Sequence, residues 1–352
     1  MATVVENRTP RSRLPLRLVR SEPHLYSAAC RARLFYSRYL AGRRERALFR
    51  ANASLFAMTP QERRHSEELR TQGFTVLPAF FDSSTIDRLY QKADRLFRAL
   101  HVDPTDAYSV QNKQRTSLEG LSYAELEVSE KMIAIKDPLL SIPEVIPIAF
   151  HESILRVVTN SLEYMPPWFK PLIVRDFPGA RARESSNFHK DNDEADSLQA
   201  FIYLVDIDDS RGPLVYVPGT NHYDPRSCRP RLSRDLGIGG YDGRISDDEV
   251  EKYYPRSSWS VLRVKRGSLA IIHGNGLHKG PAWPGYNDPG NKPRTAVRLD
   301  FQGHKLAKPI NRWKGAKIRA ADYRHLSSLQ RLFSEQSAVV SDASSDLAGA
   351  YV

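Results

Sequence analysis

Cysteine is almost absent from this chain: Cys30 and Cys228 are the only two among 352 residues, and no Cys-x-x-Cys pair occurs. A disulfide framework is therefore not expected, and a bound metal would have to use His, Asp or Glu instead of thiolates. The chain also lacks an apolar run long enough to cross a bilayer. Its basic N-terminus is not followed by the apolar stretch of a secretory signal. We therefore expect a cytoplasmic protein without a membrane span.

Lysine is missing from the first 50 residues, and acidic residues are scarce there. This segment contains twelve arginines and three acidic residues, which gives a net charge of +9. The other 302 residues contain 40 basic and 38 acidic residues, which gives a net charge of +2. The basicity therefore belongs to an N-terminal arm, which we interpret as solvated or partner-docking, with an organellar transit peptide as the alternative. Nucleic-acid binding is not expected, because the nearly neutral body shows no basic stripe with interleaved aromatic residues.

The pattern of apolar residues divides the chain into three parts. Residues 1–65 are predicted to form an arginine-rich, partly helical N-terminal extension. Residues 66–310 are predicted to form the main domain, which starts with a short strand at 74–78 and an amphipathic helix at 82–100. Residues 311–352 are predicted to form a C-terminal helix and a loose tail.

The main domain becomes rich in short strands from about Trp168 onward. Apolar segments separated by Gly/Pro turns lie at 171–176, 198–207, 212–219, 259–264, 269–273 and 295–301. Several short strands with such turns predict a sandwich or barrel, so the expected fold is mainly β with flanking helices. In the last segment, residues 296, 298 and 300 alternate with residues 297, 299 and 301, so the two sets are expected to face opposite sides.

A His-x-Asp pair at His189 and Asp191 is the first chemical signal. On an extended segment, residues i and i+2 point to the same face, so both side chains can bind one ion. A third ligand would come from a distant strand, and His278 lies just past the strand at 269–273. Two imidazoles and one carboxylate on one face of an iron ion are typical of non-haem Fe(II) oxygenases. His273 is the rival third ligand.

Two arginines follow the last of these histidines. Arg294 lies sixteen residues after His278, within Pro-Arg-Thr-Ala-Val. Its planar guanidinium can donate two parallel hydrogen bonds to the carboxylate of a keto-acid cosubstrate. Arg298 lies four residues further on, which in a strand puts both arginines on the same face. Spacing alone therefore leaves both arginines open for this role.

Four motifs in order resemble those of the phytanoyl-CoA dioxygenases, over roughly residues 66–302. They are Gly-Phe-Thr-Val-Leu-Pro at 73–78, Asn-Phe-His-Lys-Asp at 187–191, Gly-Pro-Leu-Val-Tyr-Val-Pro-Gly-Thr-Asn-His at 212–222, and Ile-His-Gly-Asn-Gly-Leu-His-Lys-Gly at 272–280 followed by Arg-Thr-Ala-Val at 294–297. The family consists of Fe(II)/2-oxoglutarate oxygenases. The resemblance therefore implies a double-stranded β-helix core, also called a jelly roll or cupin-like fold.

The resemblance also implies roles for single residues. His189, Asp191 and His278 would be the catalytic metal ligands, and Arg294 would bind the far carboxylate of 2-oxoglutarate. Two further residues would contact the cosubstrate, namely Phe201 in the lining of its pocket and Lys136. The cofactors implied are Fe(II), 2-oxoglutarate and O2.

Three departures from the family pattern stand out. Lys190 replaces the usual glutamine or other polar residue between the first two ligands, and Lys279-Gly280 replaces the Gly-Ser that often follows the last one. The loop at 281–292 is longer than usual. We interpret it as a lid near the iron, with Trp283 and Tyr286 as candidate substrate contacts and surface packing of these two side chains as the alternative.

The expected function is a dioxygenase that hydroxylates a C–H bond of a small natural-product or lipid-like molecule and releases succinate and CO2. Asp191 fills the position that halogenating relatives leave for chloride, which favours hydroxylation over halogenation. Desaturation or cyclisation by the same iron centre is one alternative. A catalytically silent jelly-roll scaffold that binds a small molecule or a protein is another. We expect a monomer or a homodimer.

Overall fold

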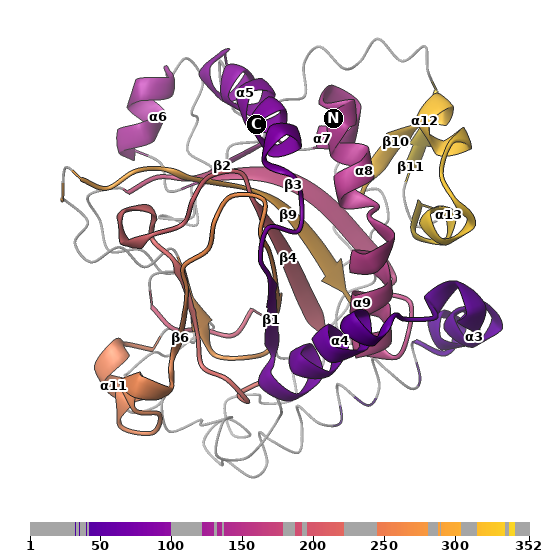
Figure 1. Ribbon diagram of the computed structural model, residues 1–352, viewed down its shortest axis with the longest axis horizontal. Coiled ribbons are helices and arrows are strands. Elements are labelled where there is room, and N and C mark those ends of the chain that lie inside the picture. The colour runs from indigo at the N-terminus through magenta and orange to yellow at the C-terminus, as the bar shows by residue number, and fades with distance from the viewer. Residues whose placement is uncertain are drawn as a thin grey trace, which may run out of the picture.

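A computed structural model describes part of the chain. These are residues 32, 35, 40, 42–99, 122–129, 132–135, 137–178, 187–191, 196–221, 245–280, 288, 290–303, 315–334 and 338–341. Within them, two antiparallel sheets form the centre of the molecule and helices flank the larger sheet (Figure 1). None of the helices in these residues is both long and apolar enough to cross a membrane.

The larger sheet has the strand order β1-β7-β4-β9-β3-β2, and all its pairings are antiparallel. Its strands are β1 (Phe74–Leu77), β2 (Met132–Ile135), β3 (Trp168–Asp176), β4 (Ser197–Tyr203), β7 (Leu269–His273) and β9 (Arg294–Gln302). The predicted strands at 74–78, 171–176, 269–273 and 295–301 are confirmed, with ends that differ by no more than three residues. The predicted strand at 198–207 is shorter, because β4 ends at Tyr203.

The smaller sheet has the order β6-β5-β8. Its strands are β6 (Ser260–Leu262), β5 (Leu214–Tyr216) and β8 (His278–Lys279). Isolated bridges extend it, one between His189 and His278 and one between Phe188 and Ile245. Two antiparallel sheets of this kind form the jelly roll that the sequence predicts, so the expected fold class is confirmed.

Apolar side chains from both sheets meet between them. Leu172, Phe201, Tyr203, Ala270 and Ala296 come from the larger sheet, and they share one buried cluster with Leu214, Tyr216 and Leu262 of the smaller sheet. We call the space between the sheets the barrel interior. Because strand residues alternate, Ala296 fixes the facing of its neighbours on β9. Arg294, Arg298 and Asp300 therefore point to the same side as Ala296.

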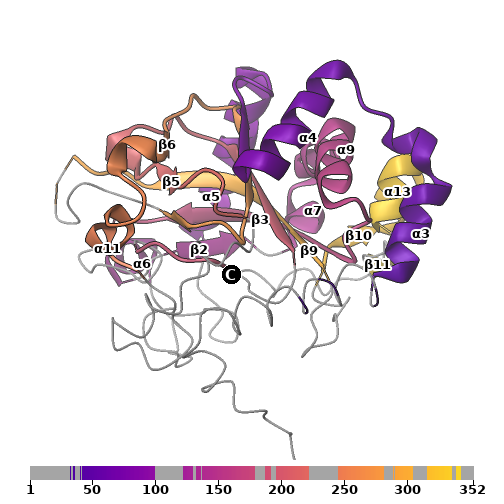
Figure 2. The same ribbon diagram turned by 90° about the horizontal axis from the view of Figure 1, so that it is seen from below.

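The opposite face of the larger sheet packs against helices. Val297, Leu299 and Phe301 of β9 share a second cluster with Leu155 and Val158 of α9 (Glu152–Leu162). The predicted alternation along 295–301 is thus confirmed. Figures 1 and 2 place β6 and α11 (Asp247–Glu251) on one side of β3 and β9, and α9 on the other.

Further helical elements surround this core. They are α3 (Arg43–Ala51), η2 (Ala53–Phe56), α4 (Pro60–Gln72), α5 (Ser83–Ala99), α6 (Tyr123–Ser129), α7 (Pro138–Ser141), η3 (Pro143–Val145), α8 (Ile146–Ala149), η5 (Asp209–Arg211), η6 (Arg256–Ser258), α12 (Ala320–Arg324) and α13 (Ser328–Ser334). Helix α4 ends at Gly73, whose φ of 83° is left-handed and favours glycine. Near the C-terminus, β10 (Lys317–Arg319) and β11 (Ala338–Val340) pair in parallel.

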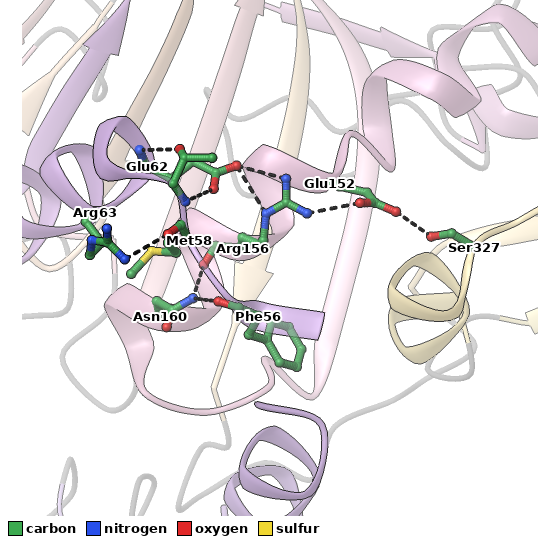
Figure 3. Close-up of polar contacts among 9 residues, drawn as sticks. Phe56, Met58, Glu62, Arg63, Glu152, Arg156, Asn160 and Ser327 are labelled. Atoms are coloured by element: carbon green, nitrogen blue, oxygen red, sulfur yellow. Dashed lines mark hydrogen bonds and ion pairs between the residues drawn. The ribbon is translucent and has the colours of Figure 1, made fainter. Parts of the chain in front are cut away.

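A polar network joins α4, α9 and the start of α13 (Figure 3). Glu62 accepts hydrogen bonds from Nε and Nη2 of Arg156 at 3.1 and 2.9 Å, and its other oxygen accepts the Thr59 amide at 2.8 Å. Arg156 Nη1 also donates to Glu152 at 3.0 Å, and Glu152 accepts the Ser327 hydroxyl at 2.7 Å. Burial alone would raise the pKa of Glu62, but the hydrogen bonds from Arg156 and Thr59 hold it below its ordinary value.

Candidate metal centre

His189, Asp191 and His278 converge at one end of the smaller sheet. One potential ligand atom from each lies within 4.8 Å of the others. Nε2 of His189 lies 3.3 Å from Oδ1 of Asp191, and Nε2 of His278 lies 3.5 Å from Oδ2 of Asp191. The structure therefore brings together the three residues that the sequence singled out. Two imidazole nitrogens and one carboxylate oxygen at this spacing fit one divalent cation.

Backbone hydrogen bonds set this arrangement. The His189 amide donates to the His278 carbonyl at 2.8 Å, and the His278 amide donates back to the His189 carbonyl at 3.0 Å. A pair that exchanges both bonds places its two residues directly opposite each other. The Asp191 amide donates to the Gly274 carbonyl at 2.7 Å, which ties the third residue to the turn before His278.

Both histidines present Nε2 to the centre because Nδ1 is occupied. His189 Nδ1 lies 3.0 Å from the Asn187 carbonyl oxygen, and His278 Nδ1 lies 2.9 Å from the Gly276 carbonyl oxygen. A carbonyl oxygen only accepts, so each Nδ1 carries the proton and each Nε2 keeps its lone pair. Fixing the tautomer through the second nitrogen is the usual arrangement for metal-binding histidines.

Asp191 is the most open of the three, with 26% of its side chain exposed against 11% for His189 and 6% for His278. Gln199 Nε2 donates to its Oδ2 at 2.9 Å. Burial would raise the pKa of Asp191, but in the metal-free chain the protonated forms of His278 and His189 outweigh burial and hold the pKa well below its ordinary value. The carboxylate is therefore ionised at neutral pH, as a metal ligand must be.

Tyr216 supports His278 from the neighbouring strand β5. Its ring lies nearly parallel to the His278 imidazole, with centroids 6.2 Å apart, and its hydroxyl donates to the His273 carbonyl at 3.0 Å. A Cβ on Gly276 would lie only 1.8 Å from that hydroxyl, and one on Gly73 only 2.3 Å. Glycine at both positions therefore leaves the space that the Tyr216 hydroxyl occupies.

Arg294 is buried in the barrel interior and paired with Asp176 on β3. Its Nε and Nη2 donate to Asp176 Oδ2 at 3.0 and 2.8 Å, and its Nη1 donates to the Gly212 carbonyl at 3.1 Å. Only 7% of the Arg294 side chain and 6% of the Asp176 side chain are exposed. A guanidinium has five N–H donors, so these three contacts leave two N–H groups for another acceptor.

Arg298 forms the second arginine–aspartate pair on the same face of β9. Its Nη2 donates to Asp300 Oδ2 at 3.0 Å, while Arg298 Nε and Asp300 Oδ1 are buried atoms for which the described residues provide no hydrogen-bond partner. Burial raises the pKa of Asp300, Arg298 offsets this only in part, and the negative charge of Asp191 raises it further. The pair thus lies within electrostatic reach of the metal centre.

Tyr203 is a residue that the sequence reasoning missed. Its hydroxyl is fully buried in the barrel interior, and no hydrogen-bond partner for it is found in the described part of the chain. Its ring lies nearly parallel to that of Phe201, with centroids 6.3 Å apart. Burial raises the pKa of Tyr203. Its partner in the register of β4 and β9 is Ala296, two residues from Arg294 on the same face of β9. The alternation along β4 from Phe201 would have pointed to it.

The other residues that the sequence suggested for the site lie outside the group of three or outside the described residues. His273 is buried outside the group of three, and its Nε2 lies 3.6 Å from Asp196 instead. Lys136 and the loop residues Trp283 and Tyr286 lie outside the described residues. The role expected for Lys136 therefore stays a prediction.

The two unexpected lysines of the motifs both have polar partners. Lys190 Nζ donates to the Thr220 carbonyl at 2.9 Å. Lys279 Nζ contacts both carboxylate oxygens of Asp247 at 2.5 and 2.6 Å and lies 5.0 Å from the centre of the Phe188 ring. These lysines therefore connect the strands of the centre to the turn after β5 and to α11.

Comparison with known families gives one match. A model of the phytanoyl-CoA dioxygenase (PhyH) family matches residues 69–283, more than half of the chain. This span contains His189, Asp191 and His278 and ends before Arg294. No curated protein matches the chain.

Several solved structures are similar to this chain. EvdO2 from Micromonospora carbonacea var. aurantiaca, complexed with 2-oxoglutarate, is 17% identical with a TM-score of 0.43, over 72% of this chain and 95% of that one. HygX from Streptomyces hygroscopicus, with nickel and 2-oxoglutarate bound, is 15% identical with a TM-score of 0.41, over 71% and 89%. The non-heme alpha-ketoglutarate-dependent epimerase SnoN from nogalamycin biosynthesis is 15% identical with a TM-score of 0.39, over 68% and 82%.

Proposed function

The chain belongs to the phytanoyl-CoA dioxygenase family, and we propose that it is an Fe(II)- and 2-oxoglutarate-dependent oxygenase. It hydroxylates a C–H bond of a small natural-product or lipid-like molecule, consumes O2 and 2-oxoglutarate, and releases succinate and CO2. The observation that carries the proposal is the convergence of His189, Asp191 and His278 within 4.8 Å. A silent scaffold would be recognised by a missing ligand, and this set is complete.

The residues of the triad supply ligation. His189 and His278 offer neutral Nε2 atoms, and Asp191 offers an ionised carboxylate oxygen. Together they would hold Fe(II) through three protein ligands and would leave coordination positions for the keto acid and O2. Fe(II), when bound, supplies the activation of O2 that accompanies decarboxylation of the keto acid.

Arg294 and Tyr203 supply the recognition of the cosubstrate. Among the described residues, two N–H groups of Arg294 and the Tyr203 hydroxyl are donors without acceptors, which fits the far carboxylate of 2-oxoglutarate. The raised pKa of Tyr203 keeps its hydroxyl protonated, and therefore a donor, at neutral pH. The Phe201 ring beside Tyr203 provides an apolar wall. Asp176 holds the guanidinium of Arg294 in place.

The test is succinate formation from 2-oxoglutarate by the full chain with Fe(II), screened against candidate substrates. The wild-type protein should form succinate, and His189→Ala should reduce it to background because one of the two imidazole ligands is gone. The mass of the organic product identifies the reaction. A gain of one oxygen atom supports hydroxylation, whereas a loss of two hydrogens indicates desaturation or cyclisation.

His325→Ala is the matched control, because His325 is an exposed histidine at the end of α12. It should leave succinate formation unchanged. If His189→Ala kept the wild-type rate, the proposed ligand set would be wrong.

A further inference from the structure

The motif at 212–222 contributes to the family resemblance, but it supplies none of the proposed ligands. In the structure, β5 and the turn that follows it lie beside the strand of His278. Tyr216 is the partner of His278 in the register of β5 and β8, and the Val217 amide donates to the Leu277 carbonyl at 2.9 Å. The motif thus contacts the segment that carries the last ligand.

Thr220, within this turn, contacts both halves of the metal centre. Its hydroxyl donates to the Val217 carbonyl at 2.7 Å and accepts the Leu277 amide at 2.8 Å. Its carbonyl accepts Nζ of Lys190 at 2.9 Å. Leu277 immediately precedes His278, and Lys190 separates His189 from Asp191. One residue, 1% exposed, therefore joins the direct chain neighbours of all three ligands.

The turn that carries Thr220 is itself held in place. Gly219 has a φ of 74°, a left-handed conformation that disfavours a side chain. Its amide donates to the Gln72 carbonyl at 2.9 Å, and Asn221 Nδ2 donates to the Arg70 carbonyl at 3.0 Å. Both acceptors belong to the last turn of α4. Thr220 is thereby fixed relative to a packed helix as well as to the centre.

We propose that Thr220 is a positioning residue of the metal centre, which holds the segment of His189 and Asp191 at a fixed distance from the segment of His278. The inference rests on the proposed function, because it takes these three residues as ligands of one ion. The ligands come from segments far apart in the sequence, so their relative placement depends on contacts between those segments. Thr220 provides such contacts to each segment through separate atoms.

The experiment measures Co(II) binding to the metal-free full chain by its visible absorption, which reports both affinity and coordination geometry. Thr220→Val removes the hydroxyl and should weaken Co(II) binding about tenfold, the lower end of what loss of supporting contacts costs a metal site. The Co(II) spectrum should change as well. Thr220→Ser keeps the hydroxyl and should bind as the wild type does. Lys190→Met, which removes the contact to the Thr220 carbonyl, should also weaken binding.

Thr75→Val is the matched control. Thr75 is a buried threonine on β1 whose hydroxyl donates to Glu68 at 2.6 Å and lies 2.8 Å from His65 Nδ1, away from the metal centre. It should lower the melting temperature without changing Co(II) affinity. Equal losses of affinity in Thr75→Val and Thr220→Val would mean general destabilisation and would overturn the inference.

The outcomes separate the two proposals. If the wild-type protein bound no Co(II), the proposed metal site and the role of Thr220 would both fail. If the wild type bound Co(II) and Thr220→Val bound it with the same affinity and spectrum, only the role of Thr220 would fail. Should Thr220→Val not fold, Lys190→Met decides, and an unchanged affinity in that variant overturns the inference.

Discussion

Two carboxyl groups, each paired with an arginine, differ in the direction of their pKa shift. Glu62 on the helical flank has a lowered pKa, whereas Asp300 in the barrel interior has a raised pKa. Burial acts in the same direction on both. Glu62 accepts two hydrogen bonds from Arg156, which outweigh its burial, but Asp300 accepts one from Arg298 and also lies in the field of Asp191. The contacts of Glu62 thus keep that carboxyl charged, whereas those of Asp300 favour its neutral form.

The two arginine–carboxylate pairs also differ in how completely their polar atoms are bonded. Both oxygens of Glu62 have partners. Arg298 Nε, Asp300 Oδ1 and the Tyr203 hydroxyl are buried, and the described residues offer them none. An unpartnered buried polar group costs about 1–3 kcal/mol, so stability alone does not account for these side chains. Such local violations are expected at functional sites. Function and stability should therefore separate when these three side chains, which share the barrel interior with Arg294, are mutated.

Arg294→Met should have the largest effect. Losing a buried, charge-assisted partner costs about 2–5 kcal/mol, so cosubstrate turnover should fall about 30-fold or more. The variant should also lose about 3–5 kcal/mol of stability, because Asp176 becomes a buried charge without its partner. Succinate formation as a function of 2-oxoglutarate concentration and urea unfolding measure the two effects.

The double variant Asp176→Asn/Arg294→Met separates the effect on cosubstrate binding from the effect on stability. Removing the orphaned charge should restore much of the stability, while the KM for 2-oxoglutarate stays high. If the double variant bound 2-oxoglutarate normally, Arg298 would be the cosubstrate arginine instead. Arg298→Met would then be the variant that raises the KM for 2-oxoglutarate.

Arg156→Met tests the flank. It removes both hydrogen bonds to Glu62 and should lower the free energy of unfolding by about 2–4 kcal/mol, since it leaves a mostly buried carboxylate unpaired. The KM for 2-oxoglutarate should not change. The control is Arg64→Met, because Arg64 is 67% exposed and its ion-pair partner within the described part of the chain is the partly exposed Glu68. Its effect should stay within about 0.5 kcal/mol. A raised KM in Arg156→Met would mean that the flank also shapes the cosubstrate site.

The convergence of His189, Asp191 and His278 was predictable from the sequence because part of their spacing is local. His189 and Asp191 share a face by simple alternation, and His278 follows a clear strand. The choice between His278 and His273 was not predictable from spacing. It depends on the backbone pair between His189 and His278, which exists only once the strands are side by side.

The supporting residues were not predictable for the same reason. Asp176 is opposite Arg294 in the register of β3 and β9. No feature of the sequence around Arg294 identifies Asp176 as its partner. Thr220 belongs to a motif whose turn was evident, yet its contacts to Lys190 and Leu277 cross between distant segments. Sequence patterns fix the facing of residues within a strand. They do not fix which strands become neighbours.

Tyr203→Phe should separate function from stability most clearly. Removing a buried hydroxyl that has no hydrogen-bond partner among the described residues should leave the free energy of unfolding unchanged or raise it by up to about 1 kcal/mol. The KM for 2-oxoglutarate should rise about tenfold, because a hydrogen bond to a charged group is worth about 1.5–3 kcal/mol. Tyr164→Phe is the matched control, since its buried hydroxyl donates to Asp196 at 3.2 Å. That variant should lose stability and keep its KM. The opposite pattern would remove Tyr203 from the site.

The smallest effect is on the pH dependence of stability in the metal-free protein, where Glu62 and Asp300 should act in opposite directions. Glu62 has a folded pKa below its ordinary 4.5, so its contribution is complete above that value and is lost as the pH falls through the folded pKa. Asp300 has a folded pKa above its ordinary 3.8, so its contribution is complete below that value and is lost as the pH rises through the folded pKa.

Urea unfolding at pH 7 and pH 4 measures the balance of these two groups. Glu62→Gln should reduce the loss of stability between pH 7 and pH 4, because it removes a carboxyl group whose contribution to stability is lost in acid. Asp300→Asn should increase that loss, because it removes a carboxyl group whose contribution to stability grows as the pH falls. A smaller loss in Asp300→Asn would mean that Arg298 outweighs burial and Asp191. The interior pair would then behave as the flank does, and the contrast between the two regions would not hold.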